Sequence, residues 1–92
     1  MQHSVFISHS TKNQAEAQLV LRALDAQGIP CWIAPRDIPG GETWAGSIME
    51  AIQTSRLMVL IFSAEAQVSQ HVVREVERAV HHAVPILPVR GS

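Results

Sequence analysis

Short apolar runs alternate along the chain with longer segments in which apolar residues recur every three or four positions. The short runs predict strands, because a strand that is covered on both faces carries no regular polar positions. The longer segments predict amphipathic helices. Four strands are therefore expected at residues 4–8, 29–33, 57–62 and 86–89, and three helices at residues 11–27, 44–55 and 70–83.

Strands that alternate with helices of this length predict an α/β fold. We expect a doubly wound, mostly parallel sheet of four strands with helices on both faces. Residues 57–62 are six apolar residues in a row, which predicts a central strand. Pro88 cannot donate a hydrogen bond to a neighbouring strand, so the last strand is expected at an edge of the sheet.

Composition limits the kind of protein to one small domain. With 92 residues, 47% of them hydrophobic and 16% charged, the chain predicts a single compact domain over residues 1–92. A formal net charge of -1 argues against a nucleic-acid partner. No apolar run approaches the roughly 20 residues of a membrane span, and Met1 to Ser4 lack the basic start of a signal peptide. We therefore expect a cytoplasmic location, and we expect Cys31 to be a buried free thiol.

The segments that follow strands are the first places to look for chemistry, because ligands of open α/β sheets bind beyond the carboxyl ends of the strands. These segments are residues 8–10, 35–43 and 63–70. None of them carries a glycine-rich dinucleotide fingerprint or a P-loop. The first strand also ends without an acidic pair, and no Gly-x-Ser-x-Gly elbow is present. The sequence thus argues against a Rossmann enzyme, a P-loop NTPase, a phospho-acceptor receiver and an α/β-hydrolase.

The expected helix at 70–83 carries the most informative carboxylate. On a helical wheel of about 100° per residue, Val76 lies at the centre of the apolar face and Glu75 at its border, with His71, Arg78 and His82 on the same flank. Two interpretations remain open: a half-buried functional carboxylate, or a carboxylate that rims the core and pairs with Arg78 at the surface. His71 and Glu75 are spaced as two metal ligands, but only His82 could add a third, so no metal is expected.

Three motifs follow one another in a characteristic order and spacing. They read Val5-Phe6-Ile7-Ser8-His9-Ser10, Arg36-Asp37-Ile38-Pro39-Gly40 and Ser69-Gln70-His71-Val72-Val73-Arg74-Glu75-Val76-Glu77. With them the chain resembles the Toll/interleukin-receptor (TIR) domain, and more closely its bacterial branch. The first corresponds to the opening-strand box of that family and the second to its BB loop, between the second strand and the second helix. The third resembles the helix in which enzymatic members carry Trp-x-x-x-Glu, and the glutamate of that motif falls on Glu75.

The chain departs from the family pattern in two places. His71 stands where the tryptophan of the helix motif would be, which replaces a large aromatic ring by a smaller, ionisable one. The sequence also ends after the fourth expected strand, whereas a complete TIR domain adds a fifth strand and a closing helix. The resemblance therefore implies the flavodoxin-like TIR fold without that C-terminal part.

Enzymatic TIR domains hydrolyse or cyclise NAD, so the resemblance implies an NAD+ nucleosidase that cleaves the bond between nicotinamide and ribose. The product would be ADP-ribose or its cyclic form, with NAD+ as the substrate and no cofactor. The resemblance assigns the catalytic role to Glu75. Substrate contacts are expected from five residues: Ser8, His9, Ser10, Trp44 and His71. Of these, His9 and Trp44 occupy positions where the family places substrate-contacting side chains.

The BB loop, residues 36–40, is the expected assembly site. Pro39 stiffens it and Gly40 lets it turn, so Arg36, Asp37 and Ile38 are displayed with little entropy left to lose. The resemblance implies self-association or docking with other TIR domains through this loop, and a head-to-tail contact can propagate into filaments. The implied setting is bacterial immune signalling, such as antiphage defence. An alternative is a non-catalytic TIR module that only assembles and does not need Glu75.

Overall fold

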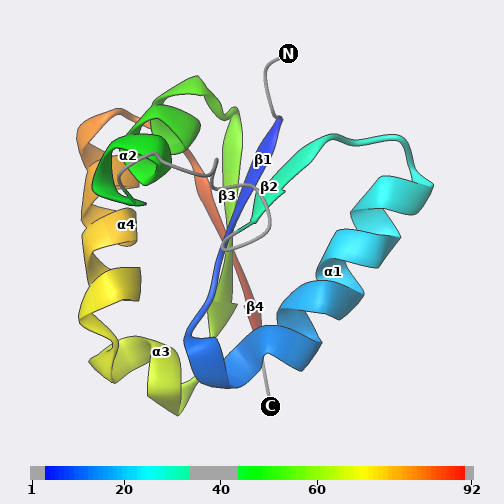
Figure 1. The fold of residues 1–92 in the computed structure, drawn as a ribbon, viewed down its shortest axis with the longest axis horizontal. Coiled ribbons are helices and arrows are strands. Elements are labelled where there is room, and N and C mark those ends of the chain that lie inside the picture. Colours follow the sequence, from blue (N-terminus) through cyan, green and yellow to red (C-terminus); the bar gives the residue numbers. More distant parts are fainter. Residues whose placement is uncertain (1–3, 34–43, 91–92) are drawn as a thin grey trace.

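The computed structural model describes residues 4–33 and 44–90 of the chain. Their strands form one parallel sheet in the order β2-β1-β3-β4, with helices on both faces (Figure 1). The strands are β1 (Val5–Ser8), β2 (Cys31–Ile33), β3 (Leu57–Phe62) and β4 (Ile86–Arg90). The expected α/β fold is confirmed, as are the central place of β3 and the edge position of β4.

The helices match the expected segments with two differences. They are α1 (Gln14–Ala26), α2 (Trp44–Thr54), α3 (Ala64–Val68) and α4 (Gln70–His81), and a 3-10 turn, η1 (Thr11–Asn13), precedes α1. The first expected helix therefore begins with a 3-10 turn that the apolar spacing does not reveal. The sequence pattern also misses α3, because five residues are too few to show helical periodicity.

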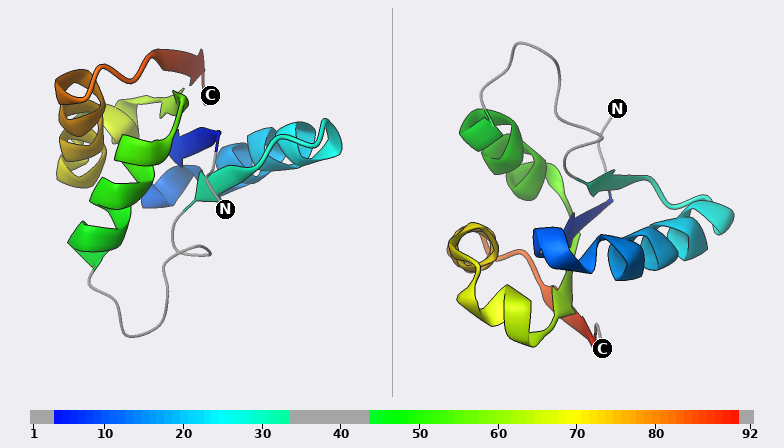
Figure 2. Two further views of the ribbon diagram at one scale, coloured as in Figure 1. Left: turned by 90° about the horizontal axis from the view of Figure 1, so that it is seen from above. Right: turned by 60° about the horizontal axis from the view of Figure 1, so that its bottom comes forward.

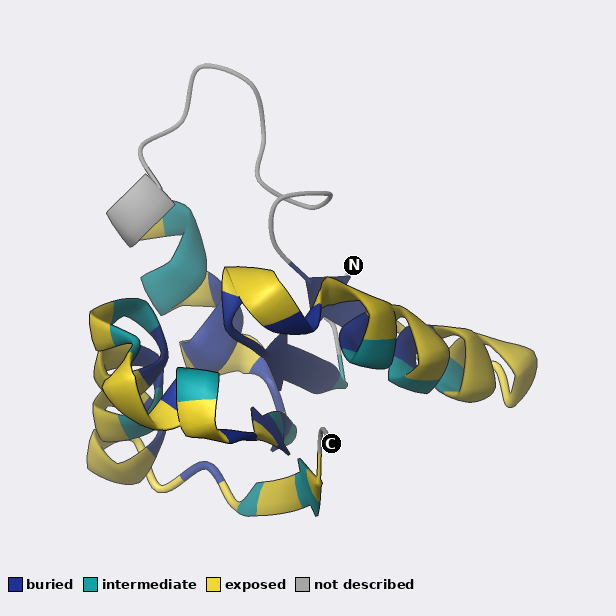
Figure 3. Cartoon of the chain, turned by 90° about the horizontal axis from the view of Figure 1, so that it is seen from below, coloured by how far each residue is buried: buried dark blue, intermediate teal, exposed yellow. Residues whose placement is uncertain are grey.

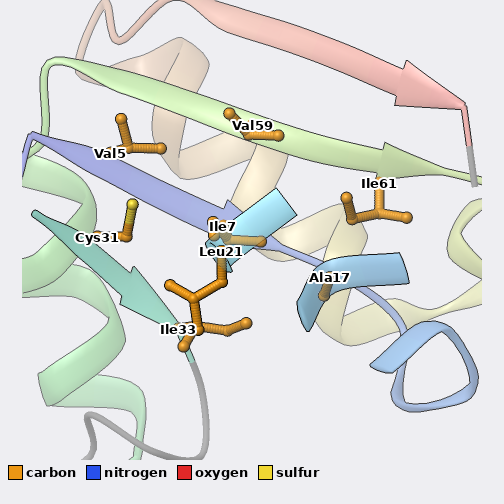
Figure 4. Packing of buried hydrophobic residues seen from close by; sticks show 8 residues of the cluster. All are labelled: Val5, Ile7, Ala17, Leu21, Cys31, Ile33, Val59 and Ile61. Carbon is orange, nitrogen blue, oxygen red and sulfur yellow. The ribbon is translucent and has the colours of Figure 1, made fainter. Parts of the chain in front are cut away.

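Alternation along the strands divides the core into two layers. Val5 and Ile7 of β1 face α1, together with residues of the same parity in β2 and β3 (Figure 4). Phe6 lies in the other layer, where α2 and α4 cover the sheet (Figure 2). Figure 3 shows β1 and β2 as buried, whereas β4 is mostly exposed and α1 carries exposed residues on its outer side. Because alternate residues of a strand share a face, the side chain of Ser8 points to the same face as Phe6, the face on which the site lies.

The layer under α2 and α4 is built around an aromatic pair. The rings of Phe6 and Trp32 stack with centroids 5.0 Å apart and an angle of 8° between their planes. Trp32 is thus packed in the sheet, and the thiol of Cys31 is buried, as expected. Ile52 of α2 and Ala79 of α4 close the layer from outside. Both helices are therefore held against the same face of the sheet.

Two further features of the described residues concern the edge of the sheet and the length of the helices. β4 leaves one side unpaired within the described sheet, and the side chain of Leu87 is 50% exposed there. Across residues 4–33 and 44–90, none of the helices is both long and apolar enough to cross a membrane.

Candidate functional site

The site is built around the carboxyl end of β1. Because side chains of a strand alternate, Ser8 lies two positions after Phe6 on the face covered by α4. Its side chain is fully buried, and its hydroxyl donates a hydrogen bond of 2.6 Å to Glu75 Oε1. A residue of the first strand thus holds a carboxyl that lies 67 positions later in the sequence.

The helix α4 places Glu75 inside its buried face. Val72, Glu75 and Ala79 are its buried residues, and Glu75 is 4% exposed. The expectation that Val76 marks the centre of this face, with Glu75 at its border, is wrong: Val76 is only half buried. Val73 and Val80 lie three residues before and four after Val76, on the apolar face expected around it, but are 43% and 67% exposed. Glu75 can be buried on this face because the hydroxyl of Ser8 donates a hydrogen bond to its carboxyl, which offsets the cost of removing the carboxyl from water.

Burial sets the protonation of Glu75. Removal from water raises the pKa of this carboxyl from 4.5 to about 7, and the hydrogen bond from Ser8 opposes that rise. His71 is on the same flank of α4, one turn earlier, with Nε2 at 3.1 Å from Glu75 Oε2. Burial and the nearby charge of His9 lower the pKa of His71. A neutral imidazole with its proton on Nε2 can donate to Glu75 Oε2 across this distance.

The two residues that follow Ser8 have different roles in the structure. His9 is buried, and its Nδ1 lies 2.8 Å from the carbonyl oxygen of Ser10. It is close enough to His71 to affect that residue's pKa. The hydroxyl of Ser10 accepts a hydrogen bond of 3.2 Å from the backbone N–H of Lys12 and so caps η1. Ser10 therefore holds the turn after β1.

A pocket of about 480 Å³ opens between α2 and α4 beside this cluster. Its size is in the range of small-molecule sites. The described residues that line it are Ile48, Met49, Gln70, His71, Arg74, Glu75 and Arg78. His71 and Glu75 were expected at a site from the sequence, whereas Arg74 and the α2 residues Ile48 and Met49 were not. On the helical wheel His71 and Arg78 share one flank of the expected helix, and in the structure that flank lines the pocket.

Several expected site residues cannot be placed against the pocket. Trp44 begins α2, but its side chain is outside the described residues. The assembly loop, residues 36–40, also lies outside the described residues. Over the described part of the chain, no three His, Cys, Asp or Glu side chains are grouped so that they could hold a metal ion.

The doubly wound parallel sheet is that of a flavodoxin-like α/β protein. Its pocket lies near the carboxyl end of the first strand, where the carboxyl of Glu75 is buried. Within this class the chain belongs to the TIR domain family, because the family model described as "TIR domain" matches residues 5–92. A comparison with curated proteins found no match.

Solved structures share the fold at low sequence identity. The TIR domain of the Toll-related receptor TRR-2 from Hydra magnipapillata has a TM-score of 0.87 and 20% identity over 95% of this chain and 69% of that one. The TIR domains of the activated Roq1 resistosome give 0.84 and 22%, over 97% of this chain and 57% of that one. A metazoan TIR-STING receptor from C. gigas gives 0.79 and 26%, over 94% and 30%. The chain thus spans only part of each of these proteins.

Proposed function

We propose that the chain cleaves the bond between nicotinamide and ribose in NAD+, with Glu75 as the catalytic residue. The TIR family to which it belongs includes NAD-cleaving enzymes. The observation that carries the proposal is a buried carboxyl in a pocket wall, fixed by Ser8 at 2.6 Å. A carboxyl with a strongly perturbed pKa in a pocket is typical of a catalytic group.

The proposed cleavage reaction requires one negative charge close to the ribose. Nicotinamide carries a positive charge in NAD+ and leaves as a neutral molecule, so no general acid has to protonate it. The charge that develops in the transition state is an oxocarbenium ion on the ribose. The carboxylate of Glu75 would stabilise that cation and hold the ribose hydroxyls, while Ser8 fixes the carboxylate from the side of the sheet. Attack of water then gives ADP-ribose, and attack within the molecule gives a cyclic product.

Other residues complete the proposed substrate site. His71 lines the pocket and contacts Glu75, so it would touch the ribose or the nicotinamide. His9 would act near the same end of β1, and Ser10 by holding the turn that follows. Trp44, at the start of α2, would stack on the nicotinamide side.

We propose that the chain is active when it assembles with other copies or other TIR domains. The BB loop would dock on a neighbouring copy or on another TIR domain, and a structural neighbour, the Roq1 resistosome, is itself described as an assembly that contains TIR domains. The proposed setting is cytoplasmic immune signalling of the bacterial type.

The test is release of free nicotinamide from NAD+ by the purified chain. NADH is the matched substrate control, because its nicotinamide ring carries no positive charge and cannot leave as a neutral molecule. Glu75→Gln should stop the release, whereas Glu77→Gln, on the exposed side of α4, should not. No release by the wild-type chain at any protein concentration would overturn the proposal and leave a TIR module that only assembles.

A further inference from the structure

The pocket carries two positive charges that the proposed chemistry does not use. Arg74 and Arg78 lie one helical turn apart on α4 and both line the pocket, on either side of Glu75 in the sequence. Arg78 reaches toward α2, with Nη1 at 3.9 Å from Met49 Sδ. Within residues 4–33 and 44–90, neither arginine forms an ion pair with a carboxylate. Both guanidinium groups are therefore available to a ligand from the side of the pocket.

The charge balance of the pocket favours an anion. Glu75 is the only acidic side chain among the described residues that line it, and its raised pKa leaves part of it uncharged near pH 7. Each guanidinium group, by contrast, brings a positive charge to the pocket. The wall formed by α4 thus has a surplus of positive charge, although the whole chain has a formal net charge of -1.

The spacing of the two arginines fits a ligand with two linked anionic groups. Side chains four residues apart on a helix start about 5–6 Å from each other, and each guanidinium can bind a phosphate through two N–H groups. A diphosphate can therefore contact both at once. Glu75, between them in the sequence but deeper in the wall, is left to face the sugar next to the diphosphate.

We infer that Arg74 and Arg78 bind the diphosphate of a dinucleotide and so determine the substrate class of this pocket. The inference rests on the proposed function, since it assumes that the ribose lies at Glu75. It predicts a preference for NAD+ over nucleosides and ribosides that lack a diphosphate.

Binding of ADP-ribose tests this without cleavage. We expect calorimetric titration of the wild-type chain to show binding of ADP-ribose, and the Arg74→Gln/Arg78→Gln double variant to lose about tenfold in affinity per arginine. The control is Arg22→Gln/Arg56→Gln, which removes the same charge from two exposed arginines outside the pocket lining. Adenosine, which has no phosphate, should bind weakly and equally to all three proteins. No binding of ADP-ribose to the wild type, or an equal loss in the control, would overturn the inference.

Steady-state cleavage of NAD+ separates the inference from the proposed function. The double variant should raise KM about as much as it weakens ADP-ribose binding, while kcat changes little, because the arginines contact a part of the substrate that does not react. Cleavage with an unchanged KM would refute the role of the arginines and keep the proposed function. Arginine-dependent binding of ADP-ribose by a chain that releases no nicotinamide would do the reverse.

Discussion

Ser8 and Glu75 form the contact on which the account of the site depends. The sequence predicts Glu75 as a candidate but leaves open whether it is functional or a surface partner of Arg78. In the structure Glu75 is buried and accepts a hydrogen bond from the hydroxyl of Ser8. Side-chain alternation along β1 points that hydroxyl toward the face of the sheet covered by α4. That pairing could not be predicted from the sequence alone, since it depends on where α4 crosses the end of β1.

Replacing this hydroxyl should change the pH dependence of cleavage. The hydrogen bond from Ser8 lowers the pKa of Glu75, so Ser8→Ala should raise that pKa further above about 7. The proposed cleavage needs the carboxylate form of Glu75, so kcat/KM should rise with pH through this pKa, and the midpoint should lie at higher pH in the variant. Activity should fall at pH 7 and recover in part in more alkaline solution.

Ser55→Ala is the matched control for this measurement. It removes another buried hydroxyl, one that bonds the carbonyl oxygen of Ala51 and does not touch Glu75. Its pH profile should follow the wild type. If Ser8→Ala kept the wild-type midpoint, Ser8 would not control the protonation of the catalytic carboxyl.

The helices and strands themselves are largely readable from the sequence. Apolar runs locate all four strands, and Gly28 and Ser69 mark helix ends where the structure has them. The apolar pattern fails on α4, since valines such as Val73 and Val80 look like core positions and are exposed. It fails because hydrophobicity does not report which neighbours a helix face will meet.

Two helix ends offer a matched pair of stability predictions. Gly28 follows α1 with φ 74°, and Ala83 follows α4 with φ 58°, so both adopt the left-handed conformation that favours glycine. Ala83→Gly should therefore stabilise the domain by about 1 kcal/mol, and Gly28→Ala should destabilise it by about as much. Among the described residues, no heavy atom beyond Gly28 and its two chain neighbours lies within 4 Å of a Cβ added there, so backbone strain sets that cost.

Urea denaturation of both variants measures this difference. The two midpoints should move in opposite directions from the wild type with unchanged m-values. A loss of stability in Ala83→Gly would mean that the end of α4 does not favour glycine in solution.

At the scale of the whole molecule, described residues of α2 and α4 line the pocket, and we propose that its activity depends on contact with other copies. The assembly loop precedes α2 in the chain, and its residues lie outside the described part of the structure. Its role in assembly therefore stays a prediction from the sequence. If a neighbouring copy completes the site through this loop, activity must follow mass action.

Specific activity should accordingly rise with protein concentration. Asp37→Ala and Gly40→Pro should abolish the rise, the first by removing a charge from the docking loop and the second by fixing its backbone. Asp25→Ala, which removes an exposed carboxylate from α1, is the control and should behave as the wild type. A specific activity that stays flat over roughly a hundredfold dilution would mean that each copy holds a complete site.

In the proposed mechanism, the carboxylate of Glu75 acts on the transition state of NAD+ cleavage. The most direct measurement is NAD+ binding and nicotinamide release by one preparation of Glu75→Gln beside the wild type. The amide keeps the volume of the side chain but loses its charge, so binding should stay within about threefold while cleavage falls by about a hundredfold or more. Nicotinamide release by Glu75→Gln at the wild-type rate would mean that the charge of Glu75 does not act on the transition state.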